Sequence, residues 1–181
     1  MNQNTVIRMG FLAGVLSGLL VVVLLLKLMR KDGSLKCKYD ERQQLVRGRG
    51  FQYGFFGWMI YDGVCILTDI GFEVHLMDLS MTLFSGMMVG TVIYVSYSVW
   101  HDGYFSLNLN PRRLMSMLGA MTVLNISCAA VRIHSGLLER GVLTFFNGSN
   151  LLMAVASLLL LGVMFAKWFK DRSNPDKGQE L

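Results

Sequence analysis

Long apolar runs separated by short polar stretches dominate the pattern of this chain. A helix needs about 20 mostly apolar residues to cross the roughly 30 Å of hydrocarbon in a bilayer, and each run is close to that length. The predicted spans cover residues 9–29, 51–72, 81–100, 114–131 and 151–169. The pattern therefore predicts an all-α integral membrane protein, a helical bundle of five transmembrane helices within a single membrane domain, residues 1–181.

Polar residues mark the expected starts of two helices. Asp40 stands at an N-cap position and Gln43 follows three residues later, a capping-box pattern that predicts a helix starting in the cytosol before the second span. Asn110 can cap the fourth helix, and Pro111 suits its first turn. The stretch "NGSN" predicts a break, so Leu137–Phe146 is expected to form a short interfacial helix on the outer surface.

Basic residues are distributed unevenly between the two ends of the predicted spans. Cytoplasmic flanks collect Lys and Arg, which predicts an outside N-terminus and a cytoplasmic C-terminus. This orientation leaves only Arg8, Arg132 and Arg140 outside. It makes residues 30–50 a basic cytoplasmic juxtamembrane segment and residues 170–181 a cytoplasmic tail. The cytoplasmic side receives Lys27, Arg30, Lys31, Lys36, Lys38, Arg42, Arg47, Arg49, Arg112, Arg113, Lys167, Lys170, Arg172 and Lys177.

Composition agrees with a membrane location. The chain is 53% hydrophobic and 16% charged, which would leave a soluble globule with too little polar surface. Its net charge of +5 is explained by topology and by attraction to a lipid bilayer with anionic headgroups, because the basic residues flank spans. They do not line one recognition element, so no nucleic-acid partner is predicted.

Glycines repeat at close spacing in three of the predicted spans. In the first span, Gly10, Gly14 and Gly18 recur every fourth residue and form a glycine zipper. Helices in lipid associate through close van der Waals contact, which small residues permit. These positions are therefore predicted to be packing interfaces within the bundle, with a second copy of the chain, or with another membrane protein. The other members of the predicted interface are Gly50, Gly54, Gly57, Gly86 and Gly90.

Acidic residues within the second span are the candidate polar site. A helix advances about 100° per residue, so Asp62, Asp69 and Glu73 project within roughly 40° of one another and form an acidic stripe. Gly54 lies about 80° from Asp62, which predicts that the stripe and the glycines occupy different faces. Such acids are expensive in hydrocarbon and usually face a bundle interior or water.

The fourth span offers partners for this stripe. Asn125, Cys128 and Arg132 share one helical face, and Arg132 is expected at the same outer level as the acids. An ion pair of Arg132 with Asp69 or Glu73 is therefore predicted. The resulting site is either a buried polar clamp that sets the helix register or part of a path for a proton, a cation or a polar ligand.

Catalytic and metal-binding patterns are not found in the sequence. Asp62 and Asp69 stand about 10 Å apart along one helix axis, too far to share a proton as a catalytic dyad does. The three cysteines form no C-x-x-C pair. His75, His134 and Asp78 could meet at the outer face, but the histidines are dispersed and lack ligand spacing. No enzyme, metal or cofactor is predicted.

The segment "YDERQQLVRGRGFQYGFF", Tyr39–Phe56, resembles one found in small, uncharacterised multi-pass membrane proteins of Gram-positive bacteria. The resemblance covers about a tenth of the chain, and it implies a multi-pass protein of the bacterial plasma membrane. It implies no particular activity.

Two functional hypotheses follow from these patterns. The favoured one is a non-catalytic membrane component with an interaction or regulatory role, which docks with other membrane proteins through small-residue faces. The alternative is a small carrier or channel subunit with a path along Asp62 and Asp69. The first is favoured because the acids cluster on one helix and no inverted repeat of discontinuous spans is visible.

Overall fold

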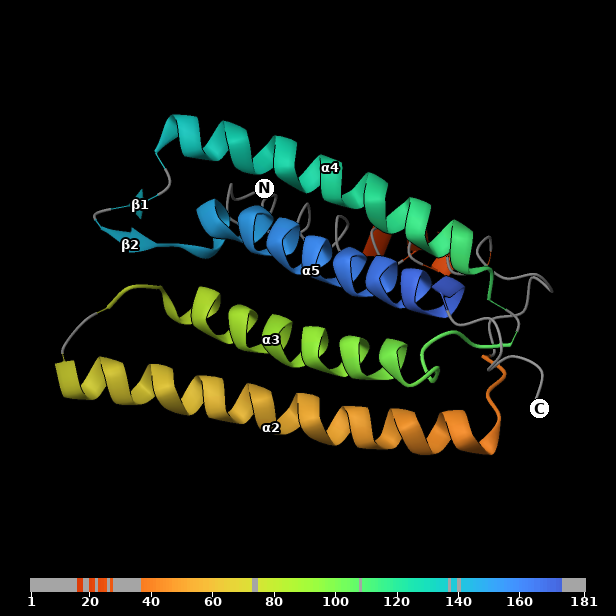
Figure 1. Cartoon of the computed structure of the whole chain (residues 1–181). Helices are drawn as coiled ribbons and strands as arrows, with labels where there is room; N and C mark the ends of the chain where they lie inside the picture. The colour runs from red at the N-terminus through yellow and green to blue at the C-terminus, as the bar shows by residue number, and fades with distance from the viewer. Residues whose placement is uncertain are drawn as a thin grey trace.

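The computed structural model describes residues 37–72, 75–107, 109–136, 138–139 and 141–173, with isolated positions between residues 16 and 27. The predicted first span with Gly10, Gly14 and Gly18, and the tail beyond residue 173, lie outside these described residues. The labelled elements are the helices α2 (Glu41–Phe72), α3 (Leu79–Trp100), α4 (Pro111–Ser135) and α5 (Phe145–Ser173), and the two-residue strands β1 (Leu138–Glu139) and β2 (Val142–Leu143) (Figure 1). All four helices are long and apolar enough to cross a membrane.

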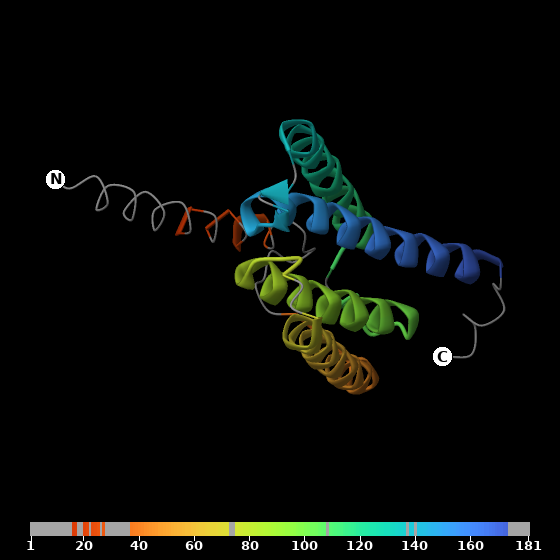
Figure 2. The ribbon, with the colours of Figure 1, turned by 90° about the vertical axis from the view of Figure 1, so that its left-hand side faces the viewer.

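The helices form a row whose spatial order differs from their order in the chain. α2 packs along α3, α3 along α5, and α5 along α4. Figure 2 shows this stack from α2 at the bottom to α4 at the top. Sequential helices run in opposite directions, so α3 and α5 are parallel neighbours, and α2 forms one edge of the row (Figures 1 and 2).

Both helix starts expected from capping patterns are present. The Asp40 carboxylate accepts a hydrogen bond from the Gln43 backbone N–H at 2.6 Å, and the Gln43 side chain accepts one from the Asp40 N–H at 3.3 Å. α2 then continues through the apolar span without a break. The Asn110 side chain accepts from the N–H groups of Arg112 and Arg113, and Pro111 occupies the first turn of α4.

The connection between α4 and α5 corrects one prediction. Instead of an interfacial helix over Leu137–Phe146, β1 and β2 pair as a short antiparallel hairpin, and α5 starts at Phe145. Gly141 has φ 85°, a left-handed conformation that glycine adopts at low cost and that allows the turn. The Leu143 N–H donates to the Leu76 carbonyl at 2.9 Å, so this backbone binds the α2–α3 loop.

The stretch "NGSN" does not break the helix, because Gly148 serves packing and not a turn. Gly148 is buried in the first turns of α5. A Cβ there would lie 2.8 Å from Leu143 Cγ and 3.0 Å from Met81 Cε. The small residue therefore lets the start of α5 approach α3 and the hairpin closely.

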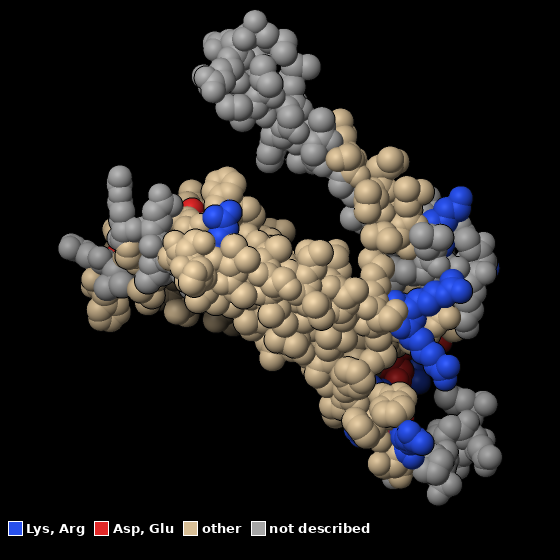
Figure 3. Space-filling view, turned by 90° about the horizontal axis from the view of Figure 1, so that it is seen from above, with Lys and Arg blue, Asp and Glu red and all other residues tan. Residues whose placement is uncertain are grey.

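Alternation of helix direction brings the basic residues to one end of the row. The starts of α2 and α4 and the ends of α3 and α5 lie together there (Figure 1). Figure 3 shows blue Lys and Arg side chains gathered at this end, beyond a long surface of other residues. We call it the basic end; its described Lys and Arg residues are Lys38, Arg42, Arg47, Arg49, Arg112, Arg113, Lys167, Lys170 and Arg172.

The best-buried apolar core lies where α3, α4 and α5 meet near the basic end. Val95 and Val99 of α3 are buried against Met164 of α5. Leu114 and Leu118 of α4 pack on this cluster. Farther along, α4 and α5 bury small and polar residues: Thr122, Asn125, Ala129, Ala154, Ala156 and Ser157.

Candidate functional site

The contact between α2 and α3 follows rows of residues spaced about four apart. In α-helices, i and i+4 residues form ridges that pack into the grooves of a neighbour. Gly50 lies against Ser98, Gly54 against Gly90, and the Trp58 and Asp62 side chains against Gly86. This α2–α3 contact is the only place where α2 buries residues among those described, namely Gly50 and Gly54.

The two backbones touch at Gly54 and Gly90. A Cβ at Gly54 would lie 2.6 Å from the Gly90 carbonyl oxygen, and one at Gly90 would lie 2.8 Å from the Gly54 carbonyl oxygen. Real Cβ atoms do not approach backbone oxygens this closely. Close approach without side chains increases van der Waals contact, the attraction that holds helices together in lipid.

Asp62 and Trp58 each place a buried polar atom beside Gly86. A Cβ at Gly86 would collide with Asp62 Oδ1 and would lie 2.8 Å from Trp58 Nε1. Both of these atoms are buried, and neither has a hydrogen-bond partner in the described part of the chain. One turn away, the hydroxyl groups of Tyr61 and Ser85 share a hydrogen bond of 2.8 Å. Polar atoms at membrane depth need partners from the protein or enclosed water, so Asp62 and Trp58, together with the buried Ser98 hydroxyl, are unsatisfied groups of this contact among the described residues.

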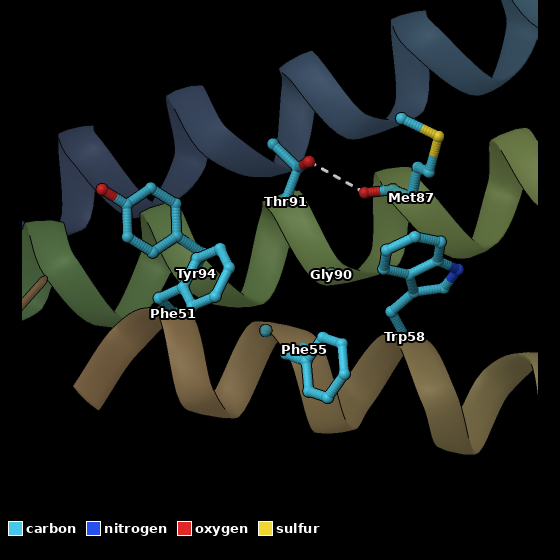
Figure 4. A pocket seen from close by; sticks show the side chains of 8 residues that line it. Phe51, Phe55, Trp58, Met87, Gly90, Thr91 and Tyr94 are labelled. Atoms are coloured by element: carbon cyan, nitrogen blue, oxygen red, sulfur yellow. Dashed lines mark hydrogen bonds between the residues drawn. The ribbon is translucent and has the colours of Figure 1, made fainter. Parts of the chain in front are cut away.

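The α2–α3 face also carries a hollow of about 200 Å³. The hollow lies over the close approach of Gly54 and Gly90 (Figure 4). Thr91 donates its hydroxyl hydrogen bond to the Met87 carbonyl, at 2.8 Å, which leaves the lining largely apolar. Asp62 does not line this hollow. The lining residues are Phe51, Gly54, Phe55, Trp58, Met87, Gly90, Thr91 and Tyr94.

The face assignment predicted for α2 is wrong. Asp62 and Gly54 both contact α3, although a straight-helix projection separates them by about 80°. A contact along an i, i+4 ridge moves around the helix by about 40° every four residues, because 3.6 residues complete a turn. Trp58, halfway between the two, belongs to the same ridge. The four-residue spacing of Gly54, Trp58 and Asp62 was the available signal for this arrangement.

Asp69 has a different partner from the one predicted. Its carboxylate forms a hydrogen bond with the His75 ring, in the loop after α2. Arg132 lies exposed near the end of α4, and the structure does not contain the predicted Arg132–Asp69 pair. α3 and α5 separate α2 from α4 in the row, which explains the difference (Figure 2). Glu73 lies outside the described residues.

Asn125 is buried at the α4–α5 contact, away from the acids. Its side-chain amide donates to the Met121 carbonyl of its own helix at 2.8 Å. Thr122, three residues earlier on the same helix, likewise donates its hydroxyl hydrogen bond to the Leu118 carbonyl, at 2.7 Å. The predicted polar cluster therefore divides among separate places: Asp62 at α3, Asp69 at the loop after α2, and Asn125 at α5.

Asp78 connects three elements at the end of the row opposite the basic end. It is the N-cap of α3, where Oδ1 accepts from the Met81 N–H at 2.7 Å. Oδ2 accepts from the Phe145 N–H, the first residue of α5, at 3.2 Å. This role explains why Asp78 does not join His75 and His134, and no cluster of three metal-ligating side chains occurs within the described ranges.

The N-terminal part of α2 is bound to the rest of the basic end. The Gln43 amide donates to the carbonyl groups of Asp102 and Phe105 at 3.3 and 3.1 Å. Arg47 Nε donates to the Tyr94 hydroxyl at 3.0 Å, and its guanidinium lies 3.8 Å from the centroid of the Tyr39 ring. Burial, then a hydrogen bond with Cys37, raises the pKa of Tyr39 to about 12 despite the opposing charge of Arg47. This segment is therefore a docked part of the fold.

The fold and the site together define a class of protein: an all-helical protein whose described part has four helices long and apolar enough to span a membrane, with a carboxylate oxygen of Asp62 buried between two of them. Comparison with protein-family models, curated proteins and solved structures finds no match. Functional conclusions therefore depend on the physical character of these surfaces.

Proposed function

We propose that this chain is a non-catalytic membrane component that docks with other membrane proteins through the outward face of α2. The observation that carries the proposal is the position of α2 at the edge of the row, with large apolar side chains exposed beside a preformed hollow. Phe51 and Phe56 are 66% and 59% exposed. Lipid tails satisfy an apolar face, but a hollow between aromatic walls also suits a side chain inserted from a neighbouring helix.

Two glycines on the same helix with open space beside them support this proposal. A Cβ at Gly63 or Gly71 would meet nothing within 4 Å. Glycine in a helix interior is less favourable than alanine by about 1 kcal/mol. Neither glycine offsets this loss of helix stability through a close contact in the described part of the chain. A partner helix that approaches α2 closely would give both glycines a packing role.

The proposed setting is a bacterial plasma membrane crossed five times, with the N-terminus outside and the C-terminus in the cytosol. The basic end would face the cytosol, because cytoplasmic flanks collect Lys and Arg. Residues 9–29 supply the fifth crossing in this proposal.

Photo-crosslinking tests the docking proposal in intact membranes. A photoreactive residue at Phe55, which lines the hollow, is expected to give a discrete protein adduct. The same residue at Val123, an equally apolar and 65% exposed position on α4, is expected to give lipid adducts alone. The adduct mass distinguishes a second copy from another protein. Lipid adducts alone at both positions would contradict the proposal.

The second candidate is a carrier or channel subunit, favoured by the unpartnered buried oxygen of Asp62. An ionisable residue within a membrane span commonly marks an ion or proton pathway. The test uses Asp62→Asn and Asp69→Asn variants in vesicles that contain a pH-sensitive dye. A path through Asp62 predicts at least a several-fold slower proton leak for Asp62→Asn, with assembly unchanged. An unchanged leak in both correctly folded variants would eliminate this candidate.

A further inference from the structure

A second hollow, of about 760 Å³, lies at the basic end between the start of α4 and the last turns of α5. Its location is distinct from the α2–α3 contact, so it is independent of the docking proposal. The lining residues are Asn110, Pro111, Arg112, Met115, Phe165 and Trp168.

The lining of this hollow changes character with depth. Arg112 is at the mouth, in the first turn of α4, and its side chain is exposed. Met115 is three residues farther along α4 than Arg112, so it lies roughly 4.5 Å deeper along the helix axis, away from the basic end. Phe165 is three residues before Trp168 in α5, so it lies deeper than Trp168 by about the same distance. A cation therefore stands above an apolar wall, and the amphipathic Trp168 ring lies nearer the basic end than Phe165 does.

The Arg112 guanidinium is available for an anion. It makes no hydrogen bond or ion pair with any residue that the structure describes. The nearest turns of α5 do not neutralise it, because Asp171 is engaged by Lys167 at 2.9 Å. Lys167 also binds Asp102, at 3.1 Å. Arg172 adds a further positive charge, with its guanidinium 5.3 Å from the Trp168 ring centroid.

We propose that this hollow binds one anionic phospholipid, with its phosphate on Arg112 and an acyl chain along Met115 and Phe165. The charge at the mouth complements the phosphate, and guanidinium groups bind phosphate through paired N–H donors. The apolar wall below complements the chain, which distinguishes a lipid from a soluble anion. The backbone N–H groups of Arg112 and Arg113 are already bound to Asn110, so the side chain of Arg112 is the anion-binding group.

Tryptophan quenching tests this site in the full chain. A Trp58→Phe, Trp100→Phe background leaves Trp168 as the fluorophore, and vesicles contain phosphatidylglycerol and phosphatidylcholine, with brominated chains on one or the other. Trp168 is expected to show about fivefold preference for phosphatidylglycerol, since one basic residue near the surface contributes about 1 kcal/mol. Arg112→Gln should abolish this preference.

Arg113→Gln is the matched control, because Arg113 carries the same charge one residue away but does not line the hollow. It should retain most of the preference. Equal loss in both variants would indicate diffuse attraction to the surface and overturn the proposal, as would displacement of the lipid by excess inorganic phosphate. If the Trp58→Phe, Trp100→Phe background folds poorly, native mass spectrometry of the chain with all three tryptophans compares the retention of phosphatidylglycerol with that of phosphatidylcholine. Equal retention of both lipids there would also overturn it.

Discussion

Replacing Gly54 with alanine is expected to force α2 away from α3 and to lower the free energy of unfolding by about 3 kcal/mol, the upper range for overpacking. The added Cβ would lie 2.6 Å from the Gly90 carbonyl oxygen and 3.1 Å from Tyr94 Cβ. The first of these is a backbone atom, which cannot rotate out of the way as a side chain can. Thermal unfolding in detergent micelles, followed by the fluorescence of Trp58 at the contact, measures the change.

Gly63→Ala provides the matched control for this prediction. Both glycines lie in α2, but a Cβ at Gly63 would meet nothing within 4 Å. The control should be unchanged or more stable by up to about 1 kcal/mol, because alanine is the better helix former. If the two substitutions had equal effects, the contact of Gly54 with Gly90 would not be a determinant of stability.

Replacing Asp78 with alanine is expected to lower the free energy of unfolding by about 2–3 kcal/mol. The substitution removes the N-cap of α3, a change that typically costs about 0.5–2 kcal/mol. It also leaves the partly buried Phe145 N–H without its acceptor, which adds about 1 kcal/mol or more. Thermal unfolding in the same micelles, with helicity followed by circular dichroism, measures the combined loss.

Asp78→Asn separates the two contributions. The asparagine oxygen can still accept from the Met81 N–H, whereas its NH₂ group cannot accept from Phe145. Roughly half of the alanine effect should therefore remain. A stability equal to the unmodified chain in both variants would show that Asp78 does not hold α3 and α5 together.

Features that depend on local chemistry were predictable. The cost of exposing peptide groups to hydrocarbon requires long apolar runs to be helical, and α3 (Leu79–Trp100) closely follows the predicted span 81–100. Capping acts over three residues, so Asp40 and Asn110 were recognisable as helix starts. The first span and Glu73 remain predictions, since both lie outside the described residues.

Features that depend on distant segments were missed. "NGSN" resembles a turn, but in the fold Gly148 packs against Leu143 and Met81 within α5. Arg132 is at the expected end of α4, yet the row places α3 and α5 between it and Asp69. Apolar spans carry little information about which neighbour each will take, because lipid satisfies an apolar surface as well as another helix does.

By itself, the sequence determined that the chain is helical, that its helices are long and apolar enough to cross a membrane, and that the basic residues gather at one end. These properties follow from the length of each run and from the alternation of direction between consecutive helices. Only the tertiary structure decided that Asp62 faces Gly86, that Asp69 pairs with His75, and that a hollow forms beside Arg112. Each of these depends on which helices are neighbours and on how the contact winds around them, and residue spacing within one helix does not specify either.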